Sequence, residues 1–236
     1  MQSRLVAVAF AGFAVVGGGC GLISSDVLDF PLDIKPRTFS IDASSWSVTQ
    51  QQVDLYTMTD CSSAPTVCNS AAQQACSANC TGACSATTHT CDLQMQISLY
   101  SAVDLMMDQS ELASIDKTKG ISVVIDTATY SVTENQLTVA TPPLTIYVAP
   151  VTVMNPSDPM AKGVGTVDSI PAMTTEPEMS IAYTATGKTD LQGAMTNFTS
   201  PFNLIVGGTI QLGEGSTVPM GKLTATVKVN AHAHAL

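Results

Sequence analysis

The 236-residue chain has few charged and few aromatic side chains, and few of its charges are positive. Nine lysines and arginines stand against 19 aspartates and glutamates, for a formal net charge of −10 at pH 7. Nucleic-acid binding depends on basic groups that neutralise phosphates, so we expect no nucleic-acid partner. The chain also lacks the polybasic cluster that attracts proteins to anionic lipid surfaces. Attachment to a membrane would therefore need an interaction other than attraction between basic side chains and anionic lipids.

Familiar catalytic motifs are missing as well. The chain has three histidines and contains no G-x-S-x-G nucleophile elbow, no H-E-x-x-H zinc motif and no phosphate-binding loop. We therefore expect no catalytic residue and no cofactor, and a hydrolase or metal-dependent enzyme ranks third among the functional hypotheses.

The first 20 residues, MQSRLVAVAFAGFAVVGGGC, have the layout of a secretion signal. Arg4 precedes an apolar run at 5–16, and three glycines follow it. The run is shorter than the roughly 20 residues that cross a bilayer, so a cleaved signal peptide is favoured over a permanent transmembrane helix. An ordinary secretory signal followed by a chance cysteine is the simplest alternative.

The segment GGGC at 17–20 resembles the lipobox of bacterial lipoproteins, although the first glycine stands where that family usually has a branched residue. The resemblance covers residues 1–20 only, and it implies cleavage after residue 19 with lipid attached to Cys20. In that family Gly21, in place of aspartate, implies the outer membrane. We therefore expect a signal peptide at 1–19, a lipid-anchored tether at 20–36 and one exported domain at 37–236. No family is recognised for that domain.

The domain shows the period-two alternation of half-buried strands. Residues 222–236 place Leu223, Ala225, Val227, Val229, Ala231, Ala233 and Ala235 on one face and polar side chains on the other. Further Thr/Val/Ile-rich strands are expected at 92–101, 120–133, 136–150, 179–186 and 203–212, with short helices at 108–115 and 189–198. We expect 120–133 and 136–150 to pair as a hairpin. Without a βαβ rhythm, the pattern predicts an all-β, antiparallel β-sandwich.

Six of the seven cysteines lie in 61–91, a segment with almost no large apolar side chains. An even cysteine count in an exported chain predicts three disulfides, which would stabilise a small, partly helical insertion in place of a core. The expected participants are Cys61, Cys68, Cys76, Cys80, Cys84 and Cys91.

The spacing of Cys76, Cys80 and Cys84 by four places them on one stripe if 71–84 is helical. Stripe neighbours have Cβ atoms about 5–6 Å apart, whereas a disulfide requires about 3.5–4.5 Å. We therefore expect no bond among these three, and each should pair with one of Cys61, Cys68 and Cys91. A zinc site using these thiols and His89 is the alternative, disfavoured by the spacing and the exported context.

His232 and His234 are weak candidates for metal ligands, because residues two apart on a strand face the same way. The sequence offers no identifiable third ligand. A polar outer face near the chain end is the favoured interpretation, so no metal is expected.

These observations favour a lipid-anchored cell-envelope module that acts without catalysis in binding, adhesion or structure, with an envelope protein or glycan as partner. The alternative is a carrier of lipid or another hydrophobic ligand, whose strands would enclose a cavity that the 11 methionines could line. A filled core is favoured. The oligomeric state is left open.

Overall fold

The computed structural model describes residues 29–76, 79–115 and 120–235. The expected signal peptide (1–19), Cys20 and the first part of the expected tether (20–28) lie outside the described residues. Within the described ranges, no helix is both long and apolar enough to span a membrane.

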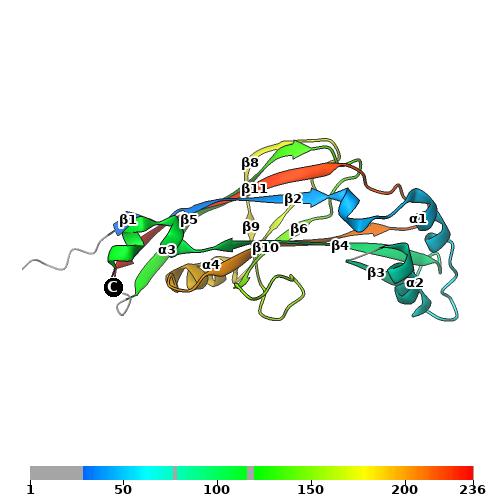
Figure 1. The fold of residues 1–236 in the computed structure, drawn as a ribbon, viewed down its shortest axis with the longest axis horizontal. Coiled ribbons are helices and arrows are strands. Elements are labelled where there is room, and N and C mark those ends of the chain that lie inside the picture. The colour runs from blue at the N-terminus through cyan, green and yellow to red at the C-terminus, as the bar shows by residue number, and fades with distance from the viewer. Residues whose placement is uncertain (1–28, 77–78, 116–119, 236) are drawn as a thin grey trace, which may run out of the picture.

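Two antiparallel sheets form a sandwich, as the sequence predicts (Figure 1). In the described residues the first sheet has the order β1-β11-β5-β8, with β2 also paired to β11. Its strands are β1 (Asp29–Pro31), β2 (Ile34–Asp42), β5 (Ile121–Asn135), β8 (Glu176–Ser180) and β11 (Lys222–Ala235).

The second sheet has the order β3-β4-β10-β6-β7-β9. Its strands are β3 (Cys80–Cys84), β4 (Cys91–Val103), β6 (Leu144–Pro150), β7 (Lys162–Val167), β9 (Ala182–Tyr183) and β10 (Phe202–Leu212). The chain passes from the first sheet to the second at the buried Ile181, between β8 and β9.

β11 is the central strand of the first sheet, and its alternation is realised in the structure. It pairs with β5 on one side and with β1 and β2 on the other. Its inward face buries Leu223, Val227, Val229, Ala231 and Ala233 in the core between the sheets.

The predicted hairpin between 120–133 and 136–150 is wrong, because β5 and β6 belong to different sheets. Asn135 ends β5 with a buried side chain that accepts from the backbone N–H of Leu137 at 3.0 Å and donates to Pro171 O at 2.9 Å. The chain then turns inward, and Leu137 is fully buried. Pro142 and Pro143 have no N–H for strand pairing, so the second arm begins only at Leu144.

The expected tether is shorter than predicted, because residues 29–36 belong to the sheet. Asp29 and Pro31 pair with β11, and Leu32 and Ile34 are 0% and 1% exposed. Apolar side chains alternate here at Phe30, Leu32 and Ile34, and the alternation is interrupted at Lys35 and Pro36, where the pairing of β2 with β11 shifts register. The strand pattern was therefore present in the sequence, but it is short and contains Pro31, a residue that is uncommon within strands.

The helix expected at 108–115 is divided into α3 (Leu105–Asp108) and η2 (Ser110–Ser114). Asp104, rather than Asp108, caps the first turn by accepting from the N–H of Met107 at 3.2 Å. Asp108 instead accepts from the guanidinium of Arg37 on β2. The helix predicted at 189–198 is confirmed as α4 (Gly187–Thr196), which packs against β5 and β7.

The remaining helices gather at one end of the sandwich. η1 (Ala43–Trp46), α1 (Gln50–Thr57) and α2 (Val67–Ala75) lie with β3 at this end, and we call the described part of 43–90 the cap. β1, α3 and the last residues of β11 lie at the opposite end (Figure 1), which we call the terminal end. The cap is thus larger than the predicted insertion, 61–91.

Candidate functional site

Three disulfides stabilise the cap, as predicted. Cys61–Cys84 and Cys68–Cys91 have Cα separations of 5.8 and 5.3 Å, and Cys76–Cys80 has 6.1 Å. The first joins the loop after α1 to β3, and the second joins α2 to the start of β4. Cys84 and Cys91 are also direct cross-strand neighbours, so the two long bridges lie side by side.

The Cys76–Cys80 bridge contradicts the prediction that Cys76, Cys80 and Cys84 form no bond with one another. The helix ends at Ala75, Cys76 is extended, and Asn79 adopts a left-handed conformation with φ of 59°. Cys80–Cys84 then forms β3 on the open edge of β4. Pairing with an available strand outweighs the modest helix propensity of an Ala-rich segment that contains Asn and Gly. Cys76, Cys80 and Cys84 therefore do not share one face of a helix, and the prediction based on their spacing is wrong.

The backbone of β3 passes very close to α1 and α2. A Cβ atom on Gly82 would lie 2.1 Å from Tyr56 Oη and 2.2 Å from the carbonyl oxygen of Cys68. Tyr56 Oη donates to that carbonyl at 2.9 Å. Burial, and then the charge of Asp92, raises the pKa of Tyr56 to about 12. Gly82 is therefore required for the helices to lie on the strand.

The sequence analysis did not anticipate α1, although a local signal was present. Thr49 and Gln52 form a capping box, in which Gln52 N–H donates to Thr49 Oγ1 and Thr49 N–H donates to Gln52 Oε1. The helix buries Val53 and Tyr56 and leaves Leu55 61% exposed. Met58, just after the helix, is 62% exposed. The cap thus presents apolar side chains on a cross-linked frame.

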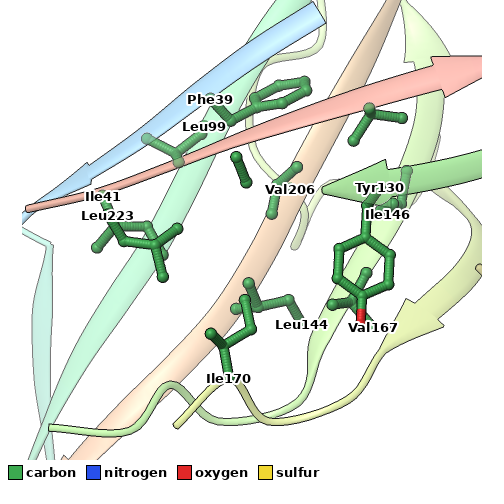
Figure 2. A pocket seen from close by; sticks show the side chains of 12 residues that line it. Phe39, Ile41, Leu99, Tyr130, Leu144, Ile146, Val167, Ile170, Val206 and Leu223 are labelled. Atoms are coloured by element: carbon green, nitrogen blue, oxygen red, sulfur yellow. The ribbon is translucent and has the colours of Figure 1, made fainter. Parts of the chain in front are cut away.

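The space between the sheets is almost completely filled. Figure 2 shows apolar side chains from both sheets, including Phe39, Tyr130, Ile146 and Val206, around a cavity of about 30 Å³. That volume equals the share of one water molecule in the liquid, whereas ligand pockets measure about 300–1,000 Å³. An acyl chain does not fit in this cavity.

A wider hollow of about 720 Å³ lies on the surface between α4, β6 and the loop before β7. Lys162 and Asp190 are its charged residues, and Lys162 Nζ lies 3.1 Å from Asp190 Oδ1. Their charges are directed at each other, so the hollow presents mainly apolar and hydroxyl groups to solvent.

His232 and His234 lie on the outer face of β11 at the terminal end, where the sequence placed them. Their ring centres are 5.3 Å apart and the ring planes meet at 83°. His232 Nδ1 lies 2.9 Å from a carboxylate oxygen of Asp126 on β5, and His234 Nδ1 lies 3.8 Å from one of Asp29 on β1. The hydrogen bond to Asp126 is the main cause that raises the pKa of His232.

No protein-family model matches this chain, and a search of the curated proteins finds no significant match. Within the described residues, one group of three sulfur atoms lies within 4.8 Å, from Cys61, Cys68 and Cys84. Each of them is bonded in a disulfide, so none is available as a thiolate ligand. Functional hypotheses therefore rest on the cap, the filled interior and the histidine pair.

Proposed function

We propose that this protein is a lipid-anchored β-sandwich of the bacterial cell envelope, a non-enzymatic binding or adhesion module that presents its cap away from the membrane. The observation that carries this proposal is the placement of the cap opposite β1 (Figure 1). The anchor proposed at Cys20 precedes Asp29 by only the eight residues 21–28. A flexible segment of that length reaches about 15 Å.

The length of the sandwich supports this orientation. At the cap end Lys222 pairs with Asp42, and at the terminal end His234 pairs with Asp29. The 14 residues of β11 extend about 45 Å at about 3.3 Å per residue. An anchor that holds the terminal end near the membrane would therefore leave the cap well clear of it.

The cap has properties that suit a recognition surface. Leu55 and Met58 are exposed, and the disulfides limit the conformational freedom of the segments packed beside them. A contact surface that is already ordered loses less entropy when a partner binds. The filled interior in turn favours an interaction module over the alternative, a carrier that would need an internal pocket for lipid.

The anchor is tested by replacing Cys20 with serine and following radiolabelled palmitate in growing cells. We expect the Cys20→Ser chain to lose the label and to leave the membrane fraction, whereas a Ser25→Ala control keeps both. Palmitate that remains on the Cys20→Ser chain would contradict the proposed anchor.

The recognition surface is tested with a photo-crosslinking amino acid at position 55 in cells. The matched control is position 107, since Met107 is also exposed but lies at the terminal end. We expect discrete crosslinked species from position 55 and none of the same species from position 107. Identical products from both positions, or none from position 55, would refute recognition through the cap. Acyl lipid that copurifies inside the Cys20→Ser chain would favour the carrier.

A further inference from the structure

The outer face of the first sheet gathers two imidazoles and two carboxylates at the terminal end. His232 and His234 project from β11, Asp126 from β5 and Asp29 from β1. Asp126 is 106 positions from His232 in the chain, so only the pairing of three strands brings these groups together. Neither carboxylate lies near the histidines in the sequence, so only the histidine pair could be recognised there.

The hydrogen bond between His232 and Asp126 determines which ring nitrogen is free. An ionised carboxylate only accepts hydrogen bonds, so His232 Nδ1 carries the proton that it donates to Asp126 at 3.0 Å. In the neutral ring, Nε2 then keeps its lone pair. Metal-binding histidines in proteins are commonly oriented in this way, by a carboxylate on the nitrogen that does not bind the metal.

The distance between the rings fits a shared ion. Two imidazoles on one tetrahedral Zn²⁺, each with a Zn–N bond of about 2.0 Å, have ring centres about 5 Å apart. The ring centres of His232 and His234 are 5.3 Å apart, which matches this separation.

Exposure and charge also suit a cation. The histidine side chains are 34% and 32% exposed, so an ion can reach them from solvent. The two carboxylates beside the rings carry opposite charge to a divalent cation and would offset it. Asp126 also holds the His232 imidazole by a hydrogen bond, which reduces the rotamer freedom lost on binding.

We propose that His232 and His234 together bind one imidazole-preferring divalent transition-metal ion, with Asp126 positioning the His232 ring and Asp29 adding negative charge beside His234. Water completes the coordination, because two protein nitrogens leave further positions open. Among first-row ions the affinity should be greatest for Cu²⁺ and also measurable for Zn²⁺. Mg²⁺ and Ca²⁺ prefer sets of oxygen ligands and should not compete. The proposal does not depend on the anchor at Cys20 or on a partner for the cap.

The test is isothermal titration of the full chain, expressed without a histidine tag, with Cu²⁺ and with Zn²⁺ at slightly alkaline pH. We expect one ion per chain. His232→Asn and His234→Asn should each abolish stoichiometric binding, and Asp126→Asn should weaken it by about 10–100-fold. His89→Asn is the matched control, since His89 is the third histidine and lies in the cap. It should bind as the unmodified chain does.

Electron paramagnetic resonance of the Cu²⁺ form provides a second readout that does not depend on stability. Two coupled imidazole nitrogens are expected in the unmodified chain, and neither single variant should show this signal. Far-UV circular dichroism should be unchanged in every variant, because the substituted side chains lie on the outer face of the sheet. Absence of stoichiometric binding in the unmodified chain would overturn the proposal, as would full binding by a His232→Asn/His234→Asn chain.

Discussion

The two long disulfides of the cap should contribute more to stability than the short one, and the difference can be worked out from the structure. Cys68–Cys91 spans 23 positions and Cys76–Cys80 spans four. The two long bridges interleave, since their cysteines follow one another along the chain in the order Cys61, Cys68, Cys84 and Cys91. The first two are seven positions apart, and so are the last two. With Cys61–Cys84 intact, Cys68–Cys91 therefore closes an effective loop of about 15 residues, which is worth about 3 kcal/mol of unfolding free energy.

The same relation gives about 2 kcal/mol for the four-residue loop of Cys76–Cys80. Packing adds to the difference. Cys68 and Cys91 are completely buried, whereas Cys80 is only partly buried. Each buried sulfur that is removed leaves a void worth about 1 kcal/mol. We therefore expect losses of about 5 kcal/mol for Cys68→Ala/Cys91→Ala and about 3 kcal/mol for Cys76→Ala/Cys80→Ala.

The assay is urea unfolding of chains that begin at residue 20 and carry Cys20→Ser, so that no unpaired thiol is present. The free energies are comparable only if the dependence on denaturant is the same in all variants. Equal losses in the two double variants, or a larger loss for the Cys76 and Cys80 pair, would refute the argument from loop length and burial.

Three further changes test the packing. Gly82→Ala should lower the free energy of unfolding in urea by at least about 2 kcal/mol, because there is no room for the added Cβ. The control is Gly193→Ala in α4, where the space around the glycine is open, and it should raise the free energy of unfolding by up to about 1 kcal/mol. The reverse order would contradict the close approach of β3 to the helices of the cap. Asp108→Asn should lower the free energy of unfolding by about 2 kcal/mol, because the Asp108 side chain is only 8% exposed and Arg37 on β2 would lose its opposite charge. An unchanged free energy of unfolding would show that this ion pair is not needed for stability. The Tyr56 phenol has a raised pKa of about 12, so it should contribute stability below pH 10 that is lost as pH rises toward 12. Ultraviolet titration should include a late-ionising component near pH 12 that Tyr56→Phe removes, and an unchanged titration curve in that variant would refute this assignment.

Local patterns predicted the parts of the fold that depend on local chemistry. The alternation of 222–236 identifies β11 and its buried face, because a strand with one face in the core must alternate. The capping box at Thr49 was equally readable as the start of α1, although the mostly polar sequence that follows conceals the helix. The number of disulfides followed from the cysteine count and the expected export of the chain.

Features that depend on contacts between distant segments could not be predicted from local sequence patterns. Cys80–Cys84 is a strand because the edge of β4 is open beside it, and that edge is not visible in residues 71–84. Leu137 lies in the segment that connects β5 to β6, and its side chain is buried in the core. The chain thus enters the core at this point, and the two strands join different sheets. His232 and His234 were visible as a pair, but Asp126 and Asp29 come from other strands.

The direct run of chain from β1 through β2 has a mechanical consequence. Residues 29–42 are already extended, they lie along β11, and Asp42 leads straight into the cap at Ala43. Tension applied between the terminal end and the cap would follow this taut backbone and would act parallel to the strands. Because the covalent backbone of 29–42 carries this load, the hydrogen bonds to β11 need not open for the force to pass between the two ends. The bridges Cys61–Cys84 and Cys68–Cys91 limit how far the cap itself could lengthen, so the molecule should behave as a stiff, nearly inextensible link under pulling forces.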